Sequence, residues 1–477
     1  MDTLLSSPLF EELFKFTAEA NGFLWGPYCL ISLLCLTGLW FTVILRGVQI
    51  SQFIPGFKRL FGGFSFFGAA AGKDGMSSFQ AVATAIAAQV GTGNLVGAMT
   101  ALIAGGPGAI FWMWIAAFFG MATIFAEACL AQIYKTTDDN GQVVGGPAYY
   151  ISRGLGNNAF SKAMAGFFAV AIILALGFMG NMVQANSISD AFNGAFGVDP
   201  IIVGGALAAI SGLIFIGGIK RIASVTEKVV PFMAVLYIIV GFAVIFKNFA
   251  HIPAVFGSII ECAFNPQAAW GGVLGISIAK AARYGIARGL FSNEAGMGST
   301  PHAHAVAKVK HPVEQGMVAI VSVFIDTFII LNISVFTVLS ADVIAFADGQ
   351  ATLKGISLIQ AAFSTTLLGD FGHSFIAICL LFFAFSTIIG WYYFAETNIR
   401  YLFGTKMLRP FQVLVMCFIF IGSVLKIELV WELADFFNGI MVLPNLIALL
   451  FLSGTVIRVL GEYNKGIPYD QNNYLKK

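Results

Sequence analysis

Long apolar runs, separated by short polar connections, make up most of this 477-residue chain. A transmembrane helix needs about 20 mostly apolar residues, whereas a membrane barrel strand has about 10 residues of alternating polarity. The runs here are long and continuous, so they favour helices. Eleven candidate spans follow, at residues 25–46, 78–104, 107–134, 163–192, 199–218, 224–247, 271–306, 313–340, 373–402, 410–426 and 431–458. The pattern predicts an all-α polytopic membrane protein with about 11 transmembrane helices, and a shorter stretch at 354–368 across its outer face.

The composition supports a membrane protein and excludes several other classes. Apolar residues form 58% of the chain and charged residues 10%, against about 45–50% and about 25% in typical soluble domains. The six cysteines show no zinc-type spacing, and the composition is unlike that of disordered, collagen-like or DNA-binding chains. We therefore expect contact with the lipid bilayer, no nucleic acid and no obligatory protein partner.

The lysines and arginines divide unequally between the two sides of the predicted membrane protein. Nineteen lie in connections on one side and four on the other, while Lys280, Arg283 and Arg288 lie inside the seventh candidate span. Cytoplasmic loops carry the excess of these residues. We therefore expect the N-terminus outside and the C-terminus in the cytoplasm, in the cytoplasmic (inner) membrane.

Two of the candidate spans contain residues that interrupt a helix. The second span contains Gly91-Thr92-Gly93-Asn94, and the seventh contains Phe291-Ser292-Asn293-Glu294-Ala295-Gly296. Non-helical backbone at membrane depth is tolerated only where protein or a water-filled cavity satisfies its polar groups. Interrupted segments at corresponding places in two halves point to a transporter site near the midplane. For the first segment alone, close helix packing through its glycines is the alternative.

The two interrupted spans divide the chain into repeats. When the span at 25–46 is set aside as a peripheral first helix, ten spans remain, and an interrupted span begins each set of five. An odd number of spans per set gives the sets opposite orientations, which predicts inverted repeats. The organisation follows as an extracytoplasmic segment 1–24, the first helix 25–46, a repeat 78–247 broken at 91–94, a repeat 254–458 broken at 291–296, and a cytoplasmic tail 459–477.

Four motifs resemble the alanine/glycine:cation symporter family of the amino acid–polyamine–cation transporter superfamily. They are GTGN at 91–94, GGPGAIFWMW at 105–114, GGPAYY at 145–150 and FSNEAG at 291–296. The resemblance covers nearly the whole chain. It implies a five-plus-five inverted-repeat fold with one additional N-terminal helix, and sodium-coupled import of alanine or glycine. A proton-coupled or exchange-type transporter of the same fold is the alternative.

The first interruption offers groups for a zwitterion and for sodium. Helix N-terminal amides favour a carboxylate, so we expect the amides of Thr92 and Gly93 to bind the carboxylate of the amino acid. Sodium, a hard cation, prefers oxygen ligands. The expected sodium ligands are the carbonyls of Ala87 and Val90, the hydroxyls of Ser386 and Thr387, and the Asn94 side chain for a second ion. The alternative for the two hydroxyls is bonding to their own helix.

Other polar and aromatic residues complete the expected site. Gln184, Asn181 and Asn293 are candidates for polar substrate contacts, and Phe291 with Trp391 for a lid over a small side chain. Interhelical hydrogen bonding or core packing is the alternative for these residues.

Charges inside the seventh span suggest a gate. Lys280, Arg283 and Arg288 share one broad helix face, and we expect Arg288 to pair with Asp326. A purely structural ion-pair network is the alternative. The HxH pair His302 and His304 has no further metal ligand nearby in the sequence.

Other function classes find no support in the motifs. The chain contains no GxSxG, HExxH or P-loop motif, so neither an enzyme nor a primary pump is expected. A channel would need repeated filters or charged rings. The expected cofactor is the co-transported sodium ion, with no organic cofactor.

Overall fold

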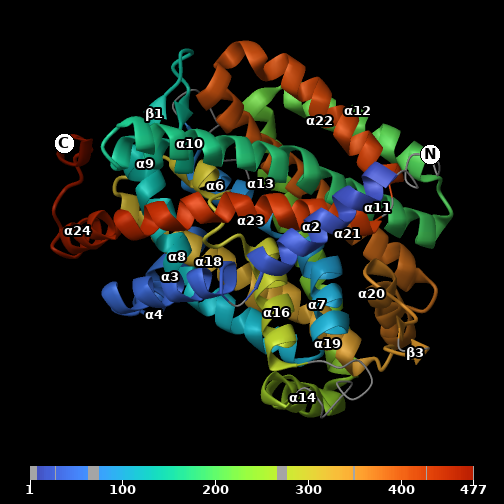
Figure 1. Ribbon diagram of the computed structural model, residues 1–477. Helices are drawn as coiled ribbons and strands as arrows, with labels where there is room; N and C mark the ends of the chain where they lie inside the picture. Colours follow the sequence, from blue (N-terminus) through green and yellow to red (C-terminus); the bar gives the residue numbers. More distant parts are fainter. Residues whose placement is uncertain are drawn as a thin grey trace.

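The structure is a computed structural model that describes residues 8–26, 28–62, 75–265, 277–347, 350–425 and 427–475, and helices dominate it (Figure 1). Its strands form two small antiparallel hairpins, β1 (Thr136–Thr137) with β2 (Val143–Val144), and β3 (Phe346–Ala347) with β4 (Gln350–Ala351). Hairpin β1–β2 and the C-terminus lie toward one end of the molecule, called here the β1 end. Hairpin β3–β4 and helix α20 (Ile356–Phe363) lie toward the other, called the α20 end (Figure 1).

The first half of the chain begins with four described helices, α2 to α5, that precede the predicted repeats, and it includes two π-helical segments, η1 and η2. Its elements are α2 (Pro8–Leu24), α3 (Leu30–Ile44), α4 (Val48–Ser51), α5 (Phe53–Gly62), α6 (Ser78–Gln89), η1 (Gly93–Gly97), α7 (Ala98–Gly105), α8 (Gly108–Tyr134), α9 (Pro147–Gly154), α10 (Ala159–Ile172), η2 (Ile173–Gly180), α11 (Asn181–Phe196), α12 (Pro200–Ile216) and α13 (Gly218–Lys247).

The second half repeats the pattern of long helices, with π-helical segments η5 and η6. Its elements are η3 (Phe249–His251), α14 (Ile252–Phe264), α16 (Ile278–Asn293), α17 (Pro301–Ala305), α18 (Pro312–Val323), η5 (Phe324–Leu331), α19 (Asn332–Ser340), α20, η6 (Ser364–Leu368), α21 (Phe371–Phe403), η7 (Thr405–Met407), α22 (Leu408–Val424), α23 (Ile427–Phe451), α24 (Ser453–Asn464) and α25 (Asn472–Leu475).

The helices agree with the predicted all-α membrane class. Within the described ranges, seven continuous helical segments are long and apolar enough to cross a membrane. The helices α6 and α7 form a further span that bends by 43° at its break. Shorter apolar helices lie at two other predicted positions, 25–46 and 199–218, whereas α16 in the predicted span 271–306 is short and carries charged residues. The count of eleven spans therefore stays a prediction. Parts of the expected segments (1–7, 27, 271–276, 426 and 476–477) lie outside the described residues.

Some boundaries differ from the expected ones. The last candidate span, 431–458, is divided between α23 and α24, because helical hydrogen bonding is interrupted around Leu452. The α14 helix occupies a connection for which no helix was predicted, and so does α2 in the N-terminal segment. The α2 helix has 17 residues and α14 has 13, fewer than the about 20 that a span needs, which explains why a search for long apolar runs missed them.

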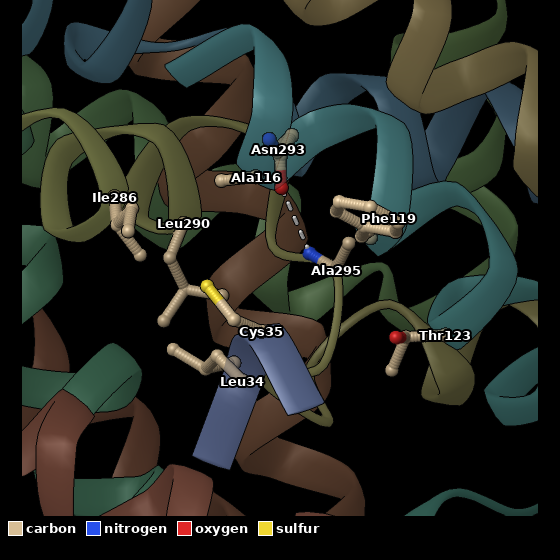
Figure 2. Close-up of a pocket in the computed structure, with 10 residues that line it drawn as sticks. Leu34, Cys35, Ala116, Phe119, Thr123, Ile286, Leu290, Asn293 and Ala295 are labelled. Atoms are coloured by element: carbon tan, nitrogen blue, oxygen red, sulfur yellow. Dashed lines mark hydrogen bonds between the residues drawn. The ribbon is translucent and has the colours of Figure 1, made fainter. Parts of the chain in front are cut away.

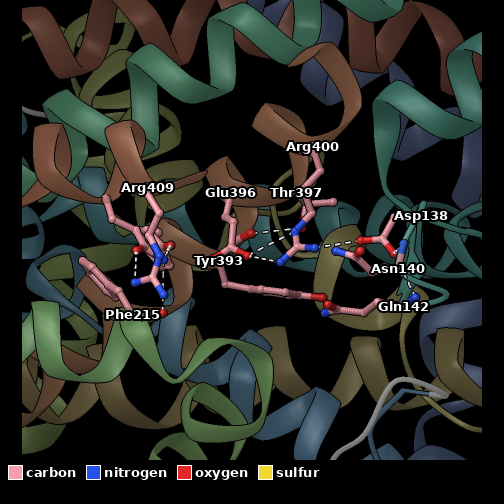
Figure 3. Close-up of polar contacts among 11 residues, drawn as sticks. Asp138, Asn140, Gln142, Phe215, Tyr393, Glu396, Thr397, Arg400 and Arg409 are labelled. Carbon is pink, nitrogen blue, oxygen red and sulfur yellow. Dashed lines mark hydrogen bonds and ion pairs between the residues drawn. The ribbon is translucent and has the colours of Figure 1, made fainter. Parts of the chain in front are cut away.

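The β1 end is closed by backbone and ion-pair contacts. Met76, just before α6, forms a parallel β-bridge with the chain after α17: its amide donates to the Val306 carbonyl, and its carbonyl accepts from the Lys308 amide, each at 2.9 Å. On the neighbouring helix α21, Arg400 binds both Asp138 of the β1–β2 connection (2.7 Å) and Glu396 (2.5 Å; Figure 3). The Met76 bridge therefore joins the start of the first broken helix to the end of the second, and the Arg400 ion pairs join the β1–β2 connection to α21.

Candidate functional site

The first break lies between α6 and η1. The α6 helix ends at Gln89, and Val90 takes an extended conformation (φ −81°, ψ 90°). Side chains bind the freed amides: Gly91 N donates to Asn94 Oδ1 (3.0 Å), and Thr92 N donates to Gln184 Oε1 (3.1 Å). The open backbone that the sequence predicted is therefore present and satisfied by protein, as membrane depth requires.

The second break begins later than the sequence indicated. Helix α16 continues through Asn293, since Glu294 N still donates to Leu290 O (2.8 Å), and the non-helical stretch is 294–300 rather than 291–296. Glu294 has a positive φ of 58°, which is costly for a residue with a side chain. The sharp change in chain direction therefore falls on Glu294.

A buried carboxylate supports the second break from the side. The Glu127 carboxylate on α8 accepts the amides of Gly296 and Gly298, each at 3.0 Å, and also Asn445 Nδ2 (2.7 Å). Behind the break, α3 packs with α8 and α16 around a small cavity, at which the Asn293 side chain accepts the Ala295 amide (Figure 2). The α3 helix, which occupies the predicted first span 25–46, therefore contacts the second broken segment.

The four oxygens expected to bind sodium lie together. Thr387 Oγ1 is 2.9 Å from the Ala87 carbonyl and 3.4 Å from the Val90 carbonyl, and Ser386 Oγ is 3.3 Å from the Ala87 carbonyl. All four residues are buried. Both hydroxyls also lie within 3.1 Å of Phe383 O on their own helix, so the alternative bonding is present as well. The set is chemically suited to a small hard cation.

The two glycines of the first break contact different partners. A Cβ atom on Gly91 would lie 2.4 Å from Thr387 Oγ1 and 3.1 Å from Gln184 Oε1. A Cβ atom on Gly93 would instead lie 2.8 Å from Ser292 Cα, on the second broken helix. Gly91 therefore allows the break to approach the oxygen cluster, and Gly93 allows the two broken helices to pack together.

Three buried polar atoms near the first break have no hydrogen-bond partner among the described residues. They are Thr92 Oγ1, Gln184 Nε2 and Asn181 Oδ1. Asn181 Nδ2 donates to Gly177 O, four residues earlier along the chain (3.1 Å), so this bond is not the interhelical one given as the alternative. Unpartnered buried polar atoms are costly and call for a ligand. Asn293, by contrast, uses its Nδ2 on Thr327 Oγ1 (3.2 Å).

Aromatic rings cover the region between the breaks. The ring of Phe291 lies perpendicular to that of Trp391, with centroids 5.6 Å apart, and 5.0 Å from that of Trp431. Trp391 Nε1 donates to the Glu294 carboxylate, which fixes the indole relative to the second break. The expected pair of Phe291 and Trp391 thus forms one continuous layer with Trp431.

Asp326 is a functional candidate whose role the sequence analysis misassigned. It was expected to pair with Arg288, yet its fully buried carboxylate accepts Asn94 Nδ2 (2.7 Å), Ser292 Oγ (3.0 Å) and Thr327 Oγ1 (3.0 Å). It thus links both broken helices through η5. Its position as the one acid in the middle of the apolar run 313–340, far from Glu314 at its start, was the available signal.

Arg288 pairs with a different acid. Its guanidinium binds the Asp435 carboxylate through two bonds of 2.7 and 2.6 Å and lies 4.8 Å from the centroid of the Trp431 ring. The predicted partner Asp326 is wrong because Arg288 extends toward α23 rather than α18 and η5. The other two expected gate residues do not join this pair: Arg283 lies over the Tyr284 ring, and Lys280 lies near the start of α16.

Replacing Arg288 with methionine is expected to lower the free energy of unfolding by about 3–5 kcal/mol, because Asp435 would remain as an unpaired, mostly buried charge. The double variant Arg288→Met/Asp435→Leu should recover most of this loss. Denaturation in detergent micelles measures both, and a single variant as stable as the parent would contradict the role given to the pair.

The histidine pair does not form a metal site in the described ranges, which contain no group of three or more His, Cys, Asp or Glu side chains able to hold a metal ion. His302 instead uses Nδ1 on Ser299 O (2.6 Å) and Nε2 on Asn398 Nδ2 (2.8 Å). His302 therefore connects the second break to α21 through hydrogen bonds.

Comparison with known proteins agrees with this geometry. The sequence pattern of the sodium:alanine symporter family matches residues 10–477. The chain belongs to the sodium:alanine symporter family. It is therefore a membrane-embedded, sodium-coupled amino acid symporter and not an enzyme. Family membership implies sodium co-transport.

The relatives of this chain are named for different substrates. The chain is 43% identical to the sodium/alanine symporter AgcS of Methanococcus maripaludis, over 93% of this chain and 96% of that protein. It is 42% identical to the probable sodium/glutamine symporter GlnT of Bacillus subtilis, over 94% and 90%. A solved structure of MhsT in complex with L-phenylalanine matches with a TM-score of 0.57 at 14% identity, covering 81% of this chain and 90% of that one. At this level of identity, the MhsT structure supports the fold of this chain alone.

Proposed function

We propose that this symporter imports alanine or glycine together with sodium, with the α20 end outside and the β1 end in the cytoplasm. The observation that carries the proposal is the meeting of the Ala87 and Val90 carbonyls with the Ser386 and Thr387 hydroxyls. This oxygen cluster lies directly against Gly91, so one short stretch of backbone serves both the ion and the amino acid.

The carboxylate of the amino acid binds at the first break. Thr92 N faces this position and is paired with Gln184 Oε1, while Gln184 Nε2 and Thr92 Oγ1 have no partner in the described structure. A rotation of the Gln184 amide frees the Thr92 amide and offers Nε2 as a second donor. The carboxylate then replaces a hydrogen bond that the protein makes to itself.

Coupling follows from shared backbone. Sodium held by the Val90 carbonyl and Thr387 Oγ1 fixes the extended residue that precedes Gly91, and so pre-orders the amides that bind the carboxylate. Each ligand therefore reduces the conformational entropy that the other must remove, which gives positive coupling between the two.

A second cation binds between Asn94 and Asp326. The Asp326 carboxylate supplies the negative charge, and the hydroxyls of Ser292 and Thr327 supply further oxygens. Among the described residues, no salt bridge includes this carboxylate. A buried carboxylate without a fixed cation is suited to a mobile one.

The substrate is small because the aromatic layer limits the space. Phe291 and Trp391 stand at right angles above the first break, and the Glu294 carboxylate holds the indole in place. A methyl side chain or hydrogen fits beneath such a layer without displacing it. The assignment rests on this geometry, because the relatives named for alanine and for glutamine are almost equally similar to this chain.

Uptake of labelled alanine by purified protein in liposomes tests the proposal. An inward sodium gradient should drive accumulation, and unlabelled glycine should compete at concentrations within about tenfold of alanine, whereas phenylalanine should not. Accumulation driven by a proton gradient without sodium would overturn sodium coupling. Strong competition by phenylalanine would overturn the small-substrate assignment.

A further inference from the structure

A cavity of about 540 Å³ lies toward the α20 end, apart from the oxygen cluster at the first break. It is lined from η1 by Val96, from α11 by Ser187 and Asp190, from α16 by Arg288, and from α23 by Trp431 and Glu432. Its size falls within the range of about 300–1,000 Å³ that is typical of small-molecule sites. Phe14 of α2 also lines it, so the N-terminal helix forms part of its wall.

This cavity is called the vestibule here. Two buried hydrogen-bond donors in its wall have no partner among the described residues. Ser187 is 1% exposed and its hydroxyl is unpaired. Arg288 is 7% exposed, and although its two terminal nitrogens bind Asp435, its Nε atom is unpaired. Unpaired buried donors of this kind require an acceptor, and a carboxylate is the strongest available one.

The same wall carries carboxylates for a positive group. Asp190 of α11 is exposed to the cavity, which Lys354 also lines, and no hydrogen bond or ion pair of the Asp190 side chain is found among the described residues. Glu432 accepts Asn21 Nδ2 at 2.7 Å with one oxygen. Donors for a carboxylate and acceptors for an ammonium group thus line one cavity, which is the arrangement that recognises an amino acid zwitterion.

The aromatic layer separates this vestibule from the first break. Trp431 lines the vestibule, while Phe291 packs beneath it and contacts Trp391 on the other side. All three rings are at most 9% exposed. A molecule in the vestibule therefore does not touch the oxygen cluster, and the two positions can be occupied together.

We infer that the vestibule is a second binding site for an amino acid zwitterion, whose carboxylate binds Ser187 Oγ and Arg288 Nε and whose ammonium group binds Asp190. The inference rests on the proposed function, because it assumes the same substrate at both positions. The N-terminal helix α2 holds the acidic side of this site through the Asn21–Glu432 contact.

Binding of labelled alanine to the purified full-length protein in saturating sodium tests the inference by stoichiometry. The parent protein should bind two alanine molecules per chain. Asp190→Asn and Ser187→Ala should each weaken one of the two sites by about tenfold or more, because each removes a hydrogen bond to a charged group. The control Glu261→Gln changes an exposed acid on α14 and should bind as the parent does.

The outcomes separate this inference from the proposed function. A single alanine per chain, or two unchanged sites in both Asp190→Asn and Ser187→Ala, overturns the second site and leaves sodium-driven uptake intact. Absence of sodium-driven alanine uptake overturns the proposed function and with it the inference. Loss of the weaker site in the two variants, with uptake still driven by sodium, supports both.

Discussion

Replacing Gly91 with alanine is expected to reduce sodium-driven uptake on the order of 100-fold. The added methyl group would lie 2.4 Å from Thr387 Oγ1, so either the backbone of the first break or the hydroxyl must move by about an ångström. Overpacking of this kind costs about 1–3 kcal/mol, and here it falls on the atoms that we propose bind both ligands. Initial uptake rates in liposomes measure the effect.

The matched control for this variant is Gly97→Ala in the same segment. A methyl group there has only ordinary contacts, with Thr92 O at 3.7 Å and Arg288 Cδ at 4.0 Å. Uptake by this control should stay within about twofold of the parent. Equal losses in the two variants would show that glycine content of the segment, rather than the approach of Gly91 to Thr387, determines transport.

The variant Asp326→Asn is expected to raise the sodium concentration needed for half-maximal uptake by at least about tenfold. The asparagine keeps the size and one acceptor oxygen of the side chain but removes its charge. Two unit charges about 4 Å apart interact by about 4 kcal/mol at an effective dielectric constant of 20, so the lost attraction is large. The ratio of labelled sodium to labelled alanine transported should also fall by one ion.

Glu227→Gln provides the control for this substitution. Glu227 is another buried acid, and it accepts Gln80 Nε2 (3.0 Å) away from the two breaks. Its neutralisation should leave the ion ratio unchanged. An unchanged ratio in Asp326→Asn would place the second cation elsewhere.

Local patterns were enough to predict the fold class and the break at GTGN around which the candidate site is built. Long apolar runs identify helices because burial in lipid demands continuous apolar surface, and GTGN marks a break because its glycines and polar residues weaken a helix. The meeting of Ala87 and Val90 with Thr387 followed from the family resemblance, and the structure places these residues together.

Other features depend on contacts between distant segments, which local patterns do not contain. Arg288 pairs with Asp435, 147 positions along the chain, and nothing in the two local sequences distinguishes that acid from Asp326. The non-helical backbone of the second break is satisfied by Glu127, whose carboxylate binds the amides of Gly296 and Gly298 from another helix. The α14 helix was not predicted because, at 13 residues, it is shorter than a membrane span.

The sodium dependence of alanine uptake by Thr387→Ala tests the central claim most directly, namely that Thr387 binds the ion beside the first break. The sodium concentration for half-maximal uptake should rise by about tenfold, since one oxygen ligand is lost. Thr397→Ala, a buried threonine of α21 whose hydroxyl donates to Tyr393 O, should match the parent. An unchanged sodium dependence in Thr387→Ala would contradict the claim.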